Sequence, residues 1–160
     1  MATSIRDWES RRTHQAWGTG WGSPALMVLV CLVVNVVSLI VSIAVNATVA
    51  NRRDNDYGYG TGWILMTIAP ATSLLWTLID VVLCHYSVLH PIYYLVEGIL
   101  LLGMNLSLAI ISILFFAWDK ASWVPGIFMA ISAIVYIGVM YFSARLIHEN
   151  RKRPQSRGSA

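Results

Sequence analysis

Two acidic residues, Asp80 and Glu97, lie within stretches of the sequence that are otherwise apolar. A carboxyl group inside a membrane is costly, and such groups often have a function. The two residues flank a predicted turn at 85–91 at similar distances, so on two antiparallel helices they would lie at the same depth. Two carboxyls at one depth can share a proton, and we expect the pair to carry at most one negative charge.

Three roles are open to this pair. Neighbouring carboxyls can act as general acid and base, as an enzyme acting on a lipid or terpenoid inside the bilayer would require. They can pass protons or bind cations or other ligands during transport. They can also act only as hydrogen-bonding groups that hold two helices together. The residue types of Asp80 and Glu97 are compatible with all three roles.

Other polar residues recur at helical spacing around the pair. Positions three, four or seven apart share one face of a helix. We therefore expect an intramembrane polar seam that includes Asn35, Ser73, Thr77, Asp80, His90, Glu97 and Asn105. His85 is a further candidate to approach the carboxyls. Two histidines and two carboxyls at mixed depths match a zinc site poorly, so we predict no metal site and no cofactor.

The elements that must position these residues are membrane-spanning helices. The chain is 57% hydrophobic and 12% charged, about half the charge density of a soluble domain. Runs of about 20 apolar residues cross the hydrocarbon core of a bilayer as helices, and the alternation typical of a membrane barrel is missing. We predict an all-α membrane protein whose four spans cover about 24–46, 62–84, 91–117 and 122–145.

The basic residues predict the orientation. Eight lie in the two terminal segments and three in the loops that follow the first and third spans. Since cytosolic flanks are enriched in Lys and Arg, both termini should be cytosolic. Residues 1–23 would form a cytosolic arm, 24–147 the transmembrane domain, and 148–160 a basic disordered tail. The tails suit the anionic cytosolic leaflet of a plasma membrane or endomembrane better than nucleic acid.

The short connections make consecutive helices antiparallel neighbours, which predicts an up-down-up-down four-helix bundle. Small residues form faces on the last two spans, at Asn105, Ala109 and Ser112 and at Gly126, Ala130 and Ala133. Such faces let membrane helices approach closely. They predict tight contacts within the bundle, or with another copy or partner.

Two segments carry a family resemblance. "SLLWTLIDVVL" at 73–83 and "HPIYYLVEGILLLG" at 90–103, on four predicted helices with cytosolic termini, resemble the fungal MARVEL-like membrane proteins. The glutamate at position 97 departs from the aspartate more readily expected there, and it has a longer reach. The resemblance implies a role in membrane apposition, lipid domains or vesicle traffic, and it implies no enzyme activity.

The favoured hypothesis is therefore a membrane organiser, scaffold or interaction protein. The main alternative is a small integral-membrane enzyme in which Asp80 and Glu97 act as acid and base. A proton-coupled small transporter is less favoured. Small four-helix exporters carry a glutamate in their first span, and residues 24–46 contain none.

Overall fold

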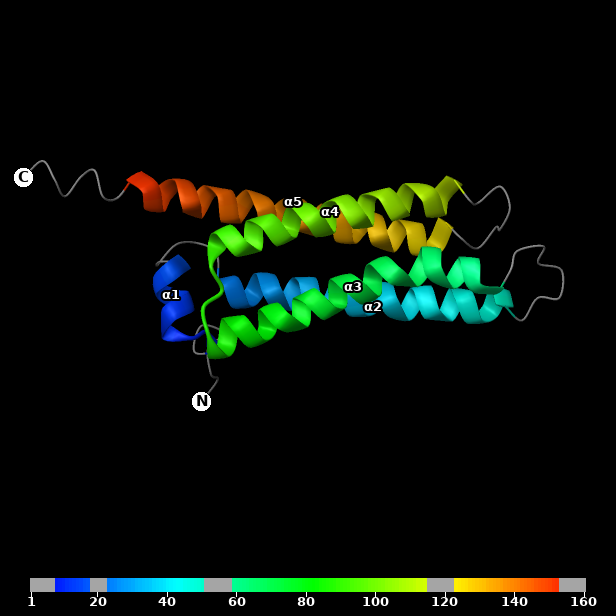
Figure 1. Ribbon diagram of the computed structural model, residues 1–160, viewed down its shortest axis with the longest axis horizontal. Helices are drawn as coiled ribbons and strands as arrows, with labels where there is room; N and C mark the ends of the chain where they lie inside the picture. Colours follow the sequence, from blue (N-terminus) through cyan, green and yellow to red (C-terminus); the bar gives the residue numbers. More distant parts are fainter. Residues whose placement is uncertain (1–7, 18–22, 51–58, 115–122, 153–160) are drawn as a thin grey trace, which may run out of the picture.

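The computed structural model describes residues 8–17, 23–50, 59–114 and 123–152, and these residues are almost entirely helical. The helices are α1 (Arg11–Trp17), α2 (Pro24–Ala50), α3 (Tyr59–Tyr86), α4 (Pro91–Leu114) and α5 (Trp123–Lys152). Figure 1 shows the four long helices lying side by side along the longest axis, with α1 across one end. The predicted all-α class is confirmed for the described residues.

Four of these helices are long and apolar enough to cross a membrane. The candidate spans are Pro24–Thr48, Met66–Tyr86, Pro91–Leu114 and Trp123–Glu149, close to those predicted from sequence. Large apolar side chains face outward along all four, for example Ile40, Leu75, Leu100 and Ile134, each at least 60% exposed. Exposing so extensive an apolar surface to water would cost free energy, whereas contact with lipid tails does not.

The four long helices form a closed ring of neighbours. α4 packs extensively against α5, α2 packs against α3, and a contact between α2 and α5 joins the two pairs. The contact between α3 and α4, on which Asp80 and Glu97 lie, is less extensive. The bundle therefore consists of two helix pairs that meet at a smaller interface.

Small residues explain the close approach of α4 and α5. A Cβ atom added at Gly126 would lie 2.8 Å from Ile113 Cγ1 and 3.3 Å from the Ala109 carbonyl oxygen. A Cβ added at Gly98 would lie 3.2 Å from Met140 Cγ. The small-residue faces predicted on these spans thus contact each other within one chain.

The N-terminal arm contains a helix that the sequence did not predict. Ser10 caps α1, because Ser10 Oγ accepts a hydrogen bond from the Thr13 backbone N–H at 3.1 Å. The arm then bonds to the turn between α3 and α4. The Ser10 N–H donates to the Cys84 carbonyl at 2.9 Å, and the Leu89 N–H donates to Thr13 Oγ1 at 3.0 Å. The first bond satisfies a carbonyl in the last turn of α3 that helix geometry leaves unpaired, and the second satisfies a backbone N–H of the turn.

Trp17 anchors the arm. Its side chain is 1% exposed, and its indole Nε1 donates a hydrogen bond to the Leu89 carbonyl at 2.6 Å. Its ring meets Tyr94 edge-on with a centroid separation of 5.8 Å. The structure buries Trp17 in an apolar cluster with Leu89, Tyr94 and Cys84.

Glu9 joins the arm to α2. Its side chain is 2% exposed, and Glu9 Oε1 accepts hydrogen bonds from Ser23 Oγ and from the Ala25 N–H. A carboxylate at a helix N-terminus pairs with unsatisfied N–H groups and with the positive end of the helix dipole. His14 Nδ1 lies 3.5 Å from Glu9 Oε2. The arm therefore contacts both α2 and the α3–α4 turn.

The last helix extends beyond the boundary predicted from sequence. α5 continues through Lys152, so residues 148–152 are helical, although the apolar run ends near residue 144. Arg145 and Glu149, one turn apart, form an ion pair at 2.9 Å that favours this extension. Residues 153–160 of the predicted tail lie outside the described residues.

Replacing Trp17 with alanine should release the arm and expose Cys84, which is 0% exposed beneath it. The lost packing of this buried ring should destabilise the bound arm by about 3 kcal/mol. The fraction of molecules in which the arm is released should then rise on the order of a hundredfold. In a Cys31→Ser background, the rate of maleimide labelling at Cys84 measures this opening. Trp76→Ala, at a half-exposed site on α3, is the control. Equal labelling rates in the two variants would contradict the anchoring role.

Candidate functional site

The carboxyl groups of Asp80 and Glu97 meet inside the bundle. Asp80 on α3 is 2% exposed and Glu97 on α4 is 7% exposed. The two side chains interact with each other, and Tyr93, one turn before Glu97, interacts with the Glu97 carboxyl. Two interacting carboxyls that are both buried cannot both ionise without a large cost, so we expect the pair to carry at most one negative charge. The structure thus brings together the two residues that the sequence places at one depth.

The carboxyl pair is not fully partnered. Asp80 Oδ1 and Glu97 Oε2 are buried, and neither receives a hydrogen bond from a donor group in the described part of the chain. Buried polar atoms in proteins are usually paired, often through ordered water. These two oxygens are therefore available to bind a proton, a water molecule or a polar group of a ligand.

The histidines do not join the carboxyls. His90 is exposed, and its Nδ1 accepts a hydrogen bond from the Ile92 N–H at 3.3 Å at the start of α4. The ring of His85 stacks on Trp8 with a centroid separation of 5.0 Å, and its Nδ1 lies 2.8 Å from the Trp8 carbonyl oxygen. Each ring lies at a helix end rather than inside the bundle. His85 therefore contacts the arm, and His90 bonds to the start of α4. Among the described residues, no group of three His, Cys, Asp or Glu side chains has the arrangement of a metal site.

A second polar centre lies deeper in the bundle, at Asn35 of α2. The Asn35 side chain is 1% exposed, and Nδ2 donates to Thr77 Oγ1 at 2.9 Å and to the Tyr136 hydroxyl at 2.8 Å. One amide group thereby links α2 to α3 and to α5. Asn35 and Thr77 belong to the predicted seam. Tyr136 does not, although a tyrosine far from both ends of a span is itself a signal, since this residue prefers the membrane interface.

The network continues from α3 to α4. Thr77 Oγ1 donates to the Ser73 carbonyl at 2.7 Å, and Asn105 Nδ2 donates to Ser73 Oγ at 2.8 Å. Asn105 is 0% exposed and also donates to the Leu101 carbonyl at 2.9 Å. All four membrane helices are thus connected by side-chain hydrogen bonds through five residues, namely Tyr136, Asn35, Thr77, Ser73 and Asn105. We call these residues the interhelical network.

The polar stripe of α2 continues beyond this network. Ser38, Ser42 and Asn46, which follow Asn35 at spacings of three or four residues, are all buried. Asn46 Nδ2 donates to the Ser42 carbonyl at 2.9 Å, whereas Ser38 Oγ and Ser42 Oγ have no hydrogen-bond partner in the described residues. The interior of the bundle is therefore polar well beyond the carboxyl pair.

Two other aromatic contacts were not foreseen from sequence. The Tyr94 hydroxyl lies 3.7 Å from Cys31 Sγ, and Trp17 packs on the ring of Tyr94. Both Cys31 and Cys84 are buried and free. These side chains form an apolar layer between the arm and the carboxyl pair, and this layer separates the pair from water at that end.

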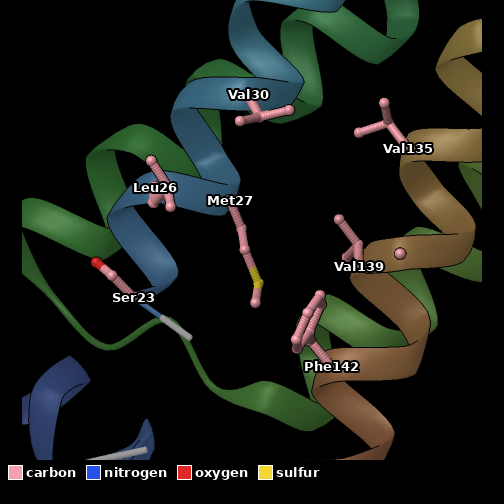
Figure 2. A pocket seen from close by; sticks show the side chains of 8 residues that line it. Ser23, Leu26, Met27, Val30, Val135, Val139 and Phe142 are labelled. Atoms are coloured by element: carbon pink, nitrogen blue, oxygen red, sulfur yellow. The ribbon is translucent and has the colours of Figure 1, made fainter. Parts of the chain in front are cut away.

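Two apolar grooves flank α2 near the arm. One, of about 320 Å³, lies between α2 and α5 and is lined by Ser23, Leu26, Met27, Val30, Val135, Gly138, Val139 and Phe142. Figure 2 shows Met27 of α2 extending toward Phe142 and Val139 of α5 across this groove. The other, of about 280 Å³, lies between α2 and α3 beside Trp8. Neither groove is lined by Asp80 or Glu97.

Comparison of the chain with protein-family models, with curated proteins and with solved structures finds no match.

The Asn35 contact predicts a measurable coupling between α2 and α5. Asn35→Leu should lower the free energy of unfolding by about 0.6 kcal/mol, and by at most roughly 2 kcal/mol, as is typical of hydrogen bonds between membrane helices. A double-mutant cycle of Asn35→Leu with Tyr136→Phe, measured by unfolding in mixed micelles, isolates the coupling energy of this one bond. Strictly additive effects of the two substitutions would refute the interhelical bond.

Proposed function

We propose that this chain is a MARVEL-like membrane organiser, with both termini in the cytosol and an up-down-up-down bundle in the plasma membrane or an endomembrane. The observation that supports it most is the interhelical network. Its hydrogen bonds, one of which is accepted by the Ser73 backbone carbonyl, link four helices and thereby stabilise one arrangement of the bundle. A rigid bundle with an apolar outer surface suits a protein that acts through its shape, its loops and its contacts with lipid and other membrane proteins.

The carboxyl pair fits this proposal as a structural contact between α3 and α4. These two helices share a limited interface. A proton held between Asp80 and Glu97 stabilises that interface from inside. Association with further copies or with other membrane proteins is part of the same proposal, as is attraction of the basic terminal segments to the anionic leaflet.

A second candidate is a small membrane enzyme that acts on a lipid or terpenoid, with Asp80 and Glu97 as acid and base. It is favoured by one specific observation, the buried and unpartnered oxygens of the two carboxyls. One carboxyl protonated and the other ionised is the pairing that acid–base chemistry needs. A proton-coupled transporter would use the same two groups.

Neutralising the carboxyl pair separates these candidates. Asn and Gln retain hydrogen bonding but exchange no proton. For an organiser, Asp80→Asn/Glu97→Gln should leave unchanged both the clustering of labelled protein and the slowing of lipid diffusion in reconstituted bilayers. Asp54→Asn/Asp56→Asn, in the loop predicted after the first span, is the charge-matched control.

The contrary outcome is equally specific. If cells producing the original chain contain a lipid or terpenoid product that cells producing Asp80→Asn/Glu97→Gln lack, the enzyme is supported and the organiser is refuted. Proton uptake into proteoliposomes that depends on the same two carboxyls would instead support the transporter.

The proposed orientation has its own test. In a Cys31→Ser/Cys84→Ser background, single cysteines are introduced at Ser156 in the C-terminal segment or at Asp56 in the loop predicted after the first span. Because the basic residues concentrate in the terminal segments, a membrane-impermeant maleimide applied from the non-cytosolic side should label position 56 and spare position 156. Labelling of position 156 with no labelling of position 56 would contradict the proposed cytosolic location of the termini.

A further inference from the structure

The groove between α2 and α5 has the features of a lipid site. Its volume of about 320 Å³ lies at the lower end of the roughly 300–1,000 Å³ typical of small-molecule sites. Apart from Ser23 at one end and Gly138, every side chain that lines it is a larger apolar group. The lining residues of both helices belong to, or immediately precede, the candidate membrane spans, so a hydrocarbon chain is the neighbour that the surroundings supply.

Gly138 leaves space in the groove. A Cβ atom added at Gly138 would meet no atom within 4 Å, in contrast to Gly126, where a Cβ would lie 2.8 Å from a neighbour. Figure 2 shows Met27 and Phe142 at the end of the groove near Ser23, with Val30 and Val135 at the other end. The volume that a larger residue at position 138 would occupy is open, and an acyl chain fits a space of this shape and polarity.

The end of the groove near the arm is polar and basic. Arg145 lies seven residues beyond Gly138, on the same stripe of α5, and its side chain is 55% exposed. α1, seen beside Ser23 in Figure 2, exposes Arg11 and Arg12 at the same end of the bundle. The nearby acidic groups are already paired. Glu149 bonds to Arg145, and Glu9 is buried against Ser23 and the start of α2.

We propose that this groove binds one acyl chain of an anionic phospholipid, with the headgroup held near Arg145 at the end of the groove next to Ser23. The lipid comes from the leaflet on the side of the arm. This inference names a ligand for the organiser proposed above, and it rests on that proposal only for the location of the chain in a membrane. Clustering tests the organiser and lipid binding tests the groove, so either proposal can fail while the other holds.

Filling the groove tests the acyl-chain contact. Native mass spectrometry of the full chain in mild detergent should show one phosphatidylserine retained, and Gly138→Leu should abolish this adduct. Gly103→Leu is the matched control, since a Cβ at Gly103 also meets no atom within 4 Å but lies on α4 outside the groove. Equal retention by Gly138→Leu and Gly103→Leu would overturn the proposal.

The headgroup is tested by competition. Phosphatidylserine should bind about fivefold more tightly than phosphatidylcholine with the same chains, since one basic residue near an anionic group supplies about 1 kcal/mol. Arg145→Gln should remove this preference while one lipid is still retained. Equal binding of both lipids to the unmodified chain would refute the choice of an anionic headgroup.

A second test uses the unmodified chain, so its result does not depend on whether the Gly138→Leu variant folds. The probe is a photoactivatable phosphatidylserine with a diazirine in its acyl chain. Crosslinks on the unmodified chain should concentrate on residues 26–30 of α2 and 135–142 of α5. An even distribution of crosslinks over all four helices would show only a general lipid shell and overturn the site. A dimer that Gly138→Leu dissociates would identify a second copy, rather than a lipid, as the occupant of the groove.

Discussion

The bundle depends on one amide group that donates in two directions. Inside a bilayer little water is available to hydrogen-bond a polar side chain, so buried donors generally bond to acceptors in the protein. Asn35 does so by bonding to Thr77 of α3 and Tyr136 of α5 at once. Ser73 then extends the connection to Asn105 of α4. Because apolar surfaces alone give no preference for one helix arrangement in lipid, these directional bonds select a particular set of neighbours.

The carboxyl pair lies between this network and the apolar layer under the arm. Cys84 is one turn from Asp80 along α3, and Tyr94 is one turn from Glu97 along α4. Both are buried and belong to the cluster that includes Trp17. The arm therefore contributes to the surroundings of Asp80 and Glu97 without touching them. By excluding water at that end it strengthens the interaction between the two carboxyl groups.

The spans were predictable from sequence, because long uncharged apolar runs indicate membrane-spanning helices. The common depth of the two carboxyls was also predictable, because a short turn fixes the relative positions of the two helices that it joins. The faces of Asn35, Thr77 and Asn105 followed from their spacing. The placement of His90 did not, because spacing alone cannot tell a residue at a helix start from one inside the bundle. α1 was also missed, since its seven residues lack apolar periodicity and its bonds go to a turn more than 70 positions away.

That separation has a consequence for the order of events during biosynthesis. The arm is synthesised before α3 and α4, yet the carbonyl that accepts the bond from Trp17 belongs to Leu89. The docking surface does not exist until α3 is complete and the chain has turned back toward α4. Contacts between residues so distant in sequence form late, because a long loop must close first. The arm is thus synthesised before the surface on which it docks, and a docked arm marks a molecule in which α2 and α3 have already been assembled.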